Sequence, residues 1–215
     1  MKPNQEIRSK QELLNHFNSS QKLEIRDSEQ MEDLLQMNVP PNVWKYALNK
    51  NLLSFSSEFV QETKEFTFDY RGIKYFYLIY FLTNLTELNL PGNKISDISS
   101  ISKLKNLRKL QLRDNCIEDI SALQSLTDLI YLDLSNNKQT SYTLTLPNLV
   151  ELLLSRNSLQ VISGLQHSPK LECLDLSWTE TTDLRSIPHQ LFGLKSDYFY
   201  QKSQIQVLFL TSYSV

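Results

Sequence analysis

Apolar residues, mostly leucine, recur along the middle of the chain at a nearly constant spacing. The pattern LxxLxLxxN, in which x is any residue, occupies five stretches: 85–93, 107–115, 129–137, 149–157 and 171–179, the last with threonine in place of asparagine. Successive stretches are shifted by 22, 22, 20 and 22 residues. Because a period of this length is typical of solenoids, we expect one structural unit per repeat.

Each unit predicts a short strand followed by a turn. In Leu88-Asn89-Leu90 apolar and polar residues alternate, as in a strand with one buried face. Such strands would pair about 4.8 Å apart in a parallel sheet. The asparagine after each strand has an amide that can satisfy backbone groups of adjacent turns, so we expect a buried ladder. Its predicted members are Asn93, Asn115, Asn137 and Asn157.

The return segments and the third unit add detail to this pattern. Asp97 and Asp119, each two residues before a serine, are expected to cap a short helix or turn opposite the strands. The third unit is two residues short and has Gln139 and Tyr142 at positions that are apolar in its neighbours. We therefore expect it to pack less regularly.

The repeat decays toward the N-terminus. A shift of 22 residues places Phe66 and Phe68 on leucine positions and Arg71 on the asparagine position, so residues 63–84 are expected to form a degenerate repeat. One further shift brings the stretch 44–49 into phase, with Trp44 and Tyr46 on leucine positions, and this signal is much weaker.

The two ends of the chain are expected to differ from the repeats. Residues 1–62 predict an N-terminal cap: Ser9 and Glu12 have the spacing of a helix capping box, residues 29–37 have helical periodicity, and 23–25 could be a degenerate strand. Solenoids need such atypical end units. The five repeats would then cover 85–191, and a C-terminal segment, 192–215, has a last LxxLxL-like stretch at 205–210 that could form a strand.

With these phased leucines and asparagines, the chain resembles the leucine-rich repeat family, in the 22-residue class found in phosphatase regulators and bacterial internalins. The resemblance implies an α/β fold. It would be a solenoid with a concave parallel sheet and with short helices, 3-10 turns or loops on the convex side. It also implies a module that holds or regulates other proteins.

Composition and charge remove several classes of function. The chain has 22 basic and 24 acidic residues and a net charge of −2, so bulk charge predicts binding to neither nucleic acid nor an anionic membrane. The longest mostly apolar run, 73–82, is too short to span a bilayer. The N-terminus lacks the apolar core of a signal peptide, and two cysteines without CxxC spacing predict no disulfide framework. We therefore expect a cytoplasmic protein.

No motif in the sequence predicts catalysis. His16, His167 and His189 are not at metal-ligand spacing from one another or from a cysteine, and no glycine-rich phosphate loop is present. Neither Cys116 nor Cys173 has a predicted base nearby. We expect no enzymatic activity, no metal, no cofactor and no small-molecule substrate.

The alternation that buries the leucines turns the residues between them outward, onto the concave side. Tyrosine, tryptophan and arginine occur there, and these residues dominate binding hot spots, so we expect another protein to bind this face. The predicted contacts are Glu87, Asn89, Lys109, Gln111, Arg113, Tyr131, Asp133, Glu151, Arg156, Asp175 and Trp178. The alternatives are a merely solvated face, an architectural role in a cytoskeletal or ciliary assembly, and a phosphatase regulatory subunit. An internalin-like surface adhesin is a further alternative, which the absence of a signal-peptide pattern and of a cell-wall anchor disfavours.

Overall fold

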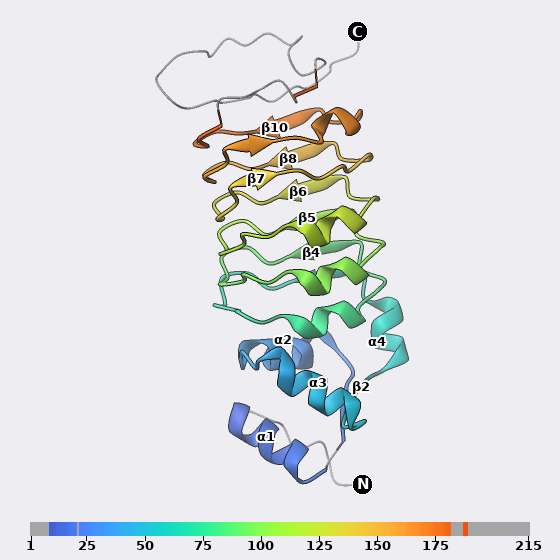
Figure 1. The fold of residues 1–215 in the computed structure, drawn as a ribbon. Coiled ribbons are helices and arrows are strands. Elements are labelled where there is room, and N and C mark those ends of the chain that lie inside the picture. Colours follow the sequence, from blue (N-terminus) through green and yellow to red (C-terminus); the bar gives the residue numbers. More distant parts are fainter. Residues whose placement is uncertain (1–8, 21, 182–186, 189–215) are drawn as a thin grey trace.

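The computed structural model describes residues 9–20, 22–181 and 187–188, and the statements below concern these residues. Three helices near the N-terminus lie at one end of a stack of strands, each strand lying beside the strand of the preceding repeat (Figure 1). The predicted strand at 205–210 and His189 lie outside the described residues.

The strands of successive repeats form one parallel sheet. In chain order, which is also their order in the sheet, they are β3 (Glu65–Thr67), β4 (Glu87–Asn89), β5 (Lys109–Gln111), β6 (Tyr131–Asp133), β8 (Glu151–Leu153) and β10 (Cys173–Asp175). The middle leucines are in register, with Leu88 beside Leu110 and Leu110 beside Leu132. The period in the sequence therefore places equivalent residues of successive repeats side by side in the sheet. The predicted leucine-rich repeat solenoid is confirmed.

Opposite the sheet, most repeats return through a turn of 3-10 helix. These turns are η1 (Tyr77–Phe81), η2 (Ser99–Lys103), η3 (Ser121–Ser125) and η4 (Leu165–His167). The carboxylates of Asp97 and Asp119 accept hydrogen bonds from the backbone N–H groups of Ser99 and Ser121, each at 2.8 Å, as predicted for caps. The space between sheet and turns is filled by side chains such as Leu110 and Leu123, which are inaccessible to solvent.

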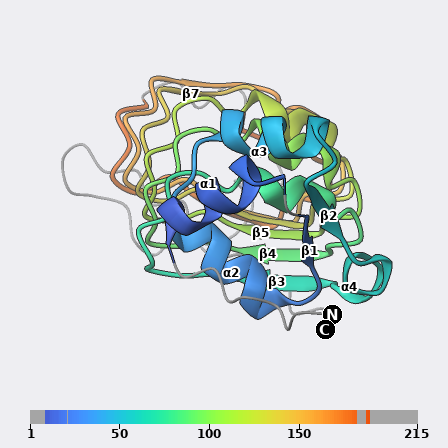
Figure 2. The same ribbon diagram turned by 90° about the horizontal axis from the view of Figure 1, so that it is seen from below.

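The shortened third repeat returns differently. In place of a 3-10 turn it has β7 (Ser141–Tyr142), which pairs in parallel with β9 (Val161–Ile162) of the next repeat. Gln124 of the preceding repeat supplies hydrogen bonds to this return segment. Its side-chain amide donates to the Thr145 carbonyl at 3.0 Å and accepts from the Thr145 N–H at 3.0 Å. The predicted irregularity is thus a local change from helix to strand. Figure 2 shows β7 on the side of the molecule away from β3, β4 and β5.

The N-terminal elements combine helices with one strand pair. They are α1 (Lys10–Asn18), β1 (Leu23–Ile25), α2 (Ser28–Gln36), α3 (Pro41–Asn49), β2 (Leu53–Phe55) and α4 (Ser57–Glu62). Helix α1 begins after Ser9, whose hydroxyl accepts a hydrogen bond from the Glu12 N–H at 3.2 Å, as the capping pattern predicts. Strand β1 lies where 23–25 was expected to be a strand, and it pairs in parallel with β2.

The repeat that the weak signal at 44–49 predicts is wrong, because this stretch is part of helix α3. Pro41 stands at the first turn of the helix, where its fixed φ favours helix and its missing N–H costs nothing. A strand would turn Trp44 and Tyr46 to the same side, whereas Trp44 is buried and Tyr46 is half exposed. The helix is a stable alternative because Trp44 and Ala47, one turn apart, can both enter the core.

The N-terminal elements are joined to the first repeat by both polar and aromatic contacts. Asn38 accepts a hydrogen bond from the Lys74 N–H at 2.6 Å and donates to the Gly72 carbonyl at 3.3 Å. Phe55 stacks on Phe81 with ring centroids 4.1 Å apart. Among the helices that the structure describes, none is long and apolar enough to cross a membrane.

Candidate protein-binding face

We call the outward side of the six-stranded sheet, together with the two residues that precede each ladder position (93, 115, 137, 157 and the equivalent positions 71 and 179), the sheet face. In β4 the middle residue, Leu88, is fully buried, whereas Glu87 and Asn89 on either side of it are partly exposed. The same alternation along each strand brings the predicted contact residues onto this one face, in parallel rows across the strands.

The part of the sheet face over β4 and β5 is internally paired. Lys109 lies in register with Glu87, and its ammonium nitrogen is 3.6 Å from a Glu87 carboxylate oxygen. The other Glu87 carboxylate oxygen accepts a hydrogen bond from the Asn89 amide at 2.9 Å, and this amide also donates to the Thr67 hydroxyl at 3.2 Å. These side chains are therefore linked to one another across three strands.

Farther along the sheet, Tyr131 and Glu151 lie side by side in register on β6 and β8. Burial and the nearby carboxylates of Asp133 and Glu151 raise the pKa of Tyr131 to about 12. Burial, followed by the charge of Asp133, also raises the pKa of Glu151 above its usual value. Both shifts reflect a partly desolvated surface on which negative charge predominates.

Asp133 is a correction to the predicted contacts, because only 6% of it is exposed. Its short side chain lies in register between those of Gln111 and Leu153, and its carboxylate accepts a hydrogen bond from the Ser135 N–H at 2.9 Å. Asp175 makes the equivalent bond to the Ser177 N–H at 2.9 Å. Asp133 therefore contributes charge to the sheet face without an accessible surface of its own.

A second row of side chains, which we call the loop row, forms one edge of the sheet face, one residue before each ladder position. All its members have a left-handed backbone, with φ between 52° and 65°: Tyr70, Gly92, Asp114, Asn136, Arg156 and Trp178. The Asp114 carboxylate accepts a hydrogen bond from the Asn136 amide at 2.7 Å and is 3.3 Å from the Arg113 guanidinium. Arg156 lies over the Trp178 ring, 5.7 Å from its centroid.

Tyr70 belongs to this row, although it is not among the predicted contacts. It is 68% exposed, and its hydroxyl donates to the Asp114 carboxylate at 3.4 Å. The repeat pattern did not identify Tyr70, because no asparagine follows this residue in the degenerate repeat. Subtracting 22 from Gly92 would have located it.

The asparagine ladder holds the loops that carry this row. The Asn115 amide donates to the carbonyls of Leu90 in the preceding repeat and Leu112 in its own, at 2.9 and 3.0 Å, and its oxygen accepts from the Ile95 N–H at 3.0 Å. The same three kinds of bond are made by Asn93, Asn137 and Asn157. All four side chains are at most 9% exposed.

Groups suited to catalysis are not gathered on this face. Burial, with the charges of Glu151 and Asp175, raises the pKa of the Cys173 thiol to about 11, which disfavours the reactive thiolate. In the described part of the chain, no group of three or more His, Cys, Asp or Glu side chains could hold a metal ion.

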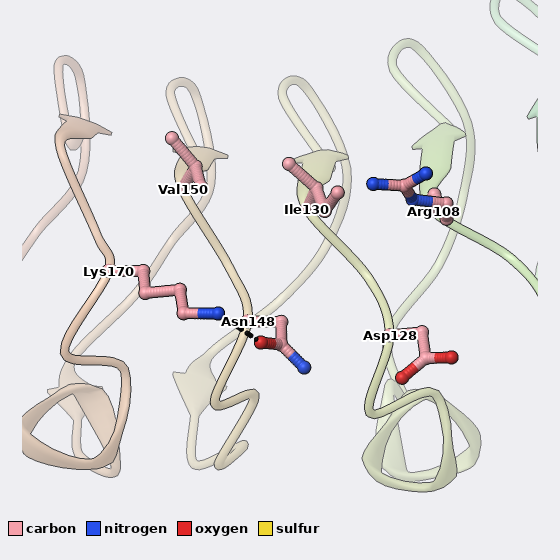
Figure 3. Close-up of a pocket in the computed structure, with 6 residues that line it drawn as sticks. All are labelled: Arg108, Asp128, Ile130, Asn148, Val150 and Lys170. Carbon is pink, nitrogen blue, oxygen red and sulfur yellow. Dashed lines mark hydrogen bonds between the residues drawn. The ribbon is translucent and has the colours of Figure 1, made fainter.

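A hollow of about 510 Å³ lies beside the sheet face, where the strands begin (Figure 3). Ile130 and Val150 form its apolar part, and Arg108 and Asp128 lie at one end. At the other end the Lys170 ammonium donates to the Asn148 side chain at 2.7 Å. None of its lining residues was among the predicted contacts.

Comparison with known proteins gives the same picture. A family model described as leucine rich repeats (2 copies) matches residues 83–125 and 105–144. The solved structure of the internalin InlF from Listeria monocytogenes is 32% identical over 59% of this chain, with a TM-score of 0.56. This chain spans only 38% of that internalin. No curated protein matches the chain.

Two further structures have lower similarity. The functional domain of InlJ from Listeria monocytogenes is 21% identical over 59% of this chain and 33% of its own, with a TM-score of 0.47. The plant peptide hormone receptor RGFR1, in complex with RGF2, is 21% identical over 74% of this chain and 23% of its own, with a TM-score of 0.46. The family match falls on the first three regular strand units, so residues 83–144 are leucine-rich repeats.

Proposed function

We propose that this protein is a non-catalytic binding module that holds a partner protein on its sheet face. Leucine-rich repeat domains are generally protein-binding modules, since stacked repeats present an extended surface. The supporting observation is the set of hot-spot residue types available there. Arg113 has 57% of its side chain exposed, Trp178 is 53% exposed, and Tyr131 is partly exposed between them.

The spacing of these residues suits one element of a partner. Arg113 follows β5 and Trp178 follows β10, and these strands are three strand spacings apart in the sheet. At about 4.8 Å per spacing the distance is roughly 15 Å, slightly more than the 10–12 Å diameter of a helix with its side chains. A helix or loop of the partner could therefore contact all three side chains together.

A cytoplasmic location is part of this proposal. Cys116 and Cys173 are free thiols in the structure, and free thiols are typical of proteins from a reducing compartment.

The test is to truncate these three side chains together, as Arg113→Ala, Tyr131→Ala and Trp178→Ala. Partners cross-linked to the whole chain in native lysate are identified by mass spectrometry, and their affinity for the purified variants is then measured. We expect the triple variant to lose several kcal/mol of binding free energy and to stay folded, since Arg113 and Trp178 are exposed and exposed substitutions usually change stability by about 0.5 kcal/mol or less.

The matched control truncates three exposed residues away from the sheet face, as Lys103→Ala, Glu118→Ala and Gln160→Ala. If this control loses the partners and the first variant keeps them, the sheet face is not the binding face. The same comparison separates the architectural alternative, because a chain that assembles through the ends of the solenoid would keep its neighbours in both variants.

A further inference from the structure

The charges on the sheet face are unbalanced, although the chain as a whole has a net charge of only −2. Seven acidic side chains belong to this face: Glu65, Asp69, Glu87, Asp114, Asp133, Glu151 and Asp175. Three basic side chains accompany them: Lys109, Arg113 and Arg156. The sheet face is therefore more acidic than the rest of the molecule.

The three basic side chains are already engaged within the face. Lys109 pairs with Glu87 at 3.6 Å, and Arg113 pairs with Asp114 at 3.3 Å. The guanidinium of Arg156 lies over the Trp178 ring. None of them forms an ion pair with the carboxylates on the strands farther along the sheet.

Those carboxylates are Asp133, Glu151 and Asp175, on the neighbouring strands β6, β8 and β10. Within the residues that the structure describes, none of the three forms an ion pair with a basic side chain. Asp133 and Asp175 are oriented by the backbone N–H groups of the serines two residues later. Three charges of one sign thus lie within two strand spacings, about 10 Å, and no basic side chain of the described residues pairs with them.

An apolar side chain lies among these charges. Leu153 is in register between Asp133 and Asp175 on the outward side of the sheet, at a position where β3, β4 and β5 have threonine, asparagine and glutamine. It is partly exposed. Tyr131, partly exposed, is in register with Glu151, so this part of the face combines uncompensated negative charge with apolar surface.

We propose that the sheet face over β6, β8 and β10 binds a basic amphipathic segment of the partner protein. This inference rests on the proposed function and specifies the chemistry of the partner. A lysine or arginine of the segment pairs with Glu151 in the field of Asp133 and Asp175, and a neighbouring apolar side chain packs on Leu153 and Tyr131. Electrostatic complementarity of this kind selects the partner and speeds its encounter, and it disfavours phosphate-rich ligands such as nucleic acids.

The probe is a displayed library of random peptides, selected against the whole chain. We expect the recovered peptides to be enriched in lysine and arginine next to apolar residues, and to bind more weakly as salt is raised. For a recovered peptide, Glu151→Lys should weaken binding at least about tenfold, because it replaces an attraction by a repulsion at the centre of the site. Glu118→Lys, the same charge change at an exposed residue outside the sheet face, should leave the affinity within about twofold.

A charge exchange distinguishes direct contact from an indirect structural effect. The peptide with its essential lysine changed to glutamate should bind the Glu151→Lys variant better than it binds the unaltered chain. Glu151→Gln, which keeps the shape of the side chain, should give an intermediate loss with the original peptide. Thermal unfolding of each variant verifies that the fold is retained.

Two results would overturn the proposal in different ways. If the recovered peptides are neutral or acidic but lose binding in Trp178→Ala, the face is right and the partner chemistry is wrong. If no recovered peptide depends on any residue of the sheet face, or none is recovered at all, the proposed function fails together with this inference.

Discussion

The ring of Tyr70 occupies the space that a side chain at position 92 would fill. Gly92 has φ +65° and carries no Cβ, so the ring can lie across it and the hydroxyl can reach Asp114 two repeats away. This contact gives the loop row an exposed aromatic residue at its N-terminal end, as Trp178 does at the other. A glycine in one repeat thus determines where a side chain of the preceding repeat lies.

Gly92→Ala should therefore destabilise the chain and displace Tyr70. The left-handed backbone alone costs an alanine about 1–2 kcal/mol, and the displaced ring adds the loss of its contacts. The matched control is Gly72→Ala, since Gly72 has φ +69° with open space around it and has only the backbone cost. In urea unfolding, Gly92→Ala should have a lower free energy of unfolding than Gly72→Ala. Equal stability of the two variants would mean that the ring contributes nothing.

Asn115→Ala should cost about 1–3 kcal/mol, because it leaves the buried Ile95 N–H without its partner and removes one of the two ladder bonds to each of the Leu90 and Leu112 carbonyls. Asn106→Ala is the control: this exposed asparagine donates to a single carbonyl, that of Thr83, at 3.0 Å. We expect a loss for it below about 1 kcal/mol in the same denaturant titration. A change within measurement error at Asn115 would remove the energetic role assigned to the ladder.

Tyr142→Phe should leave stability unchanged or increase it by about 1 kcal/mol. Tyr142 is fully buried in the irregular third repeat, and its hydroxyl has no hydrogen-bond partner among the described residues. Removing a buried hydroxyl that has no partner removes a desolvation cost and creates no cavity of consequence. A clear loss of stability in urea unfolding would show that the hydroxyl is satisfied in solution, for example by a buried water.

The chain should lose stability in alkaline solution above about pH 10, where tyrosines of the unfolded state ionise. Burial raises the pKa of Tyr142 above its usual range and raises the pKa of both Tyr131 and Tyr80 to about 12. A raised folded-state pKa stabilises the fold below the unfolded pKa, and this contribution is lost as pH rises toward the folded value. Urea midpoints measured from pH 8 to 11 should fall.

Substitution of single tyrosines tests the source of this alkaline loss. The fall in urea midpoint should be smaller in Tyr142→Phe, because its buried ring can no longer ionise on unfolding. The half-exposed Tyr46 offers the comparison, and Tyr46→Phe should follow the unaltered chain. If the urea midpoint falls equally with pH in the unaltered chain and in both variants, the alkaline loss of stability arises elsewhere in the molecule.

A chain beginning at Thr63 should aggregate or lose cooperative unfolding. Removing residues 1–62 uncovers Phe81, which stacks on Phe55, and removes the Asn38 bonds to the first repeat. Solenoids depend on their end units for solubility, so the first repeat would be left with apolar side chains in water. Light scattering and denaturant unfolding provide the measurement, and a monomeric truncated chain of equal stability would show that 1–62 is an independent appendage.

The sheet was predictable because two periods coincide in it. Alternation along a strand assigns Leu88 inward and Glu87 outward, and the 22-residue shift assigns Leu110 as the neighbour of Leu88. The predicted contact residues therefore lie on one face. The shape of the N-terminal elements was less predictable, because the phase of Trp44 and Tyr46 is compatible with a strand, while Pro41 and the local packing favour a helix.

What the sequence determined by itself is everything that depends on position within a repeat: the order of strands, their register, the buried leucines and the places of the ladder asparagines. These follow from backbone geometry, which is the same in every unit. Only the tertiary structure decided how particular side chains meet between units. The burial of Asp133, the position of Tyr70 over Gly92 and the bridge from Gln124 to Thr145 depend on the size and bonding of side chains in adjacent repeats, which no single repeat encodes.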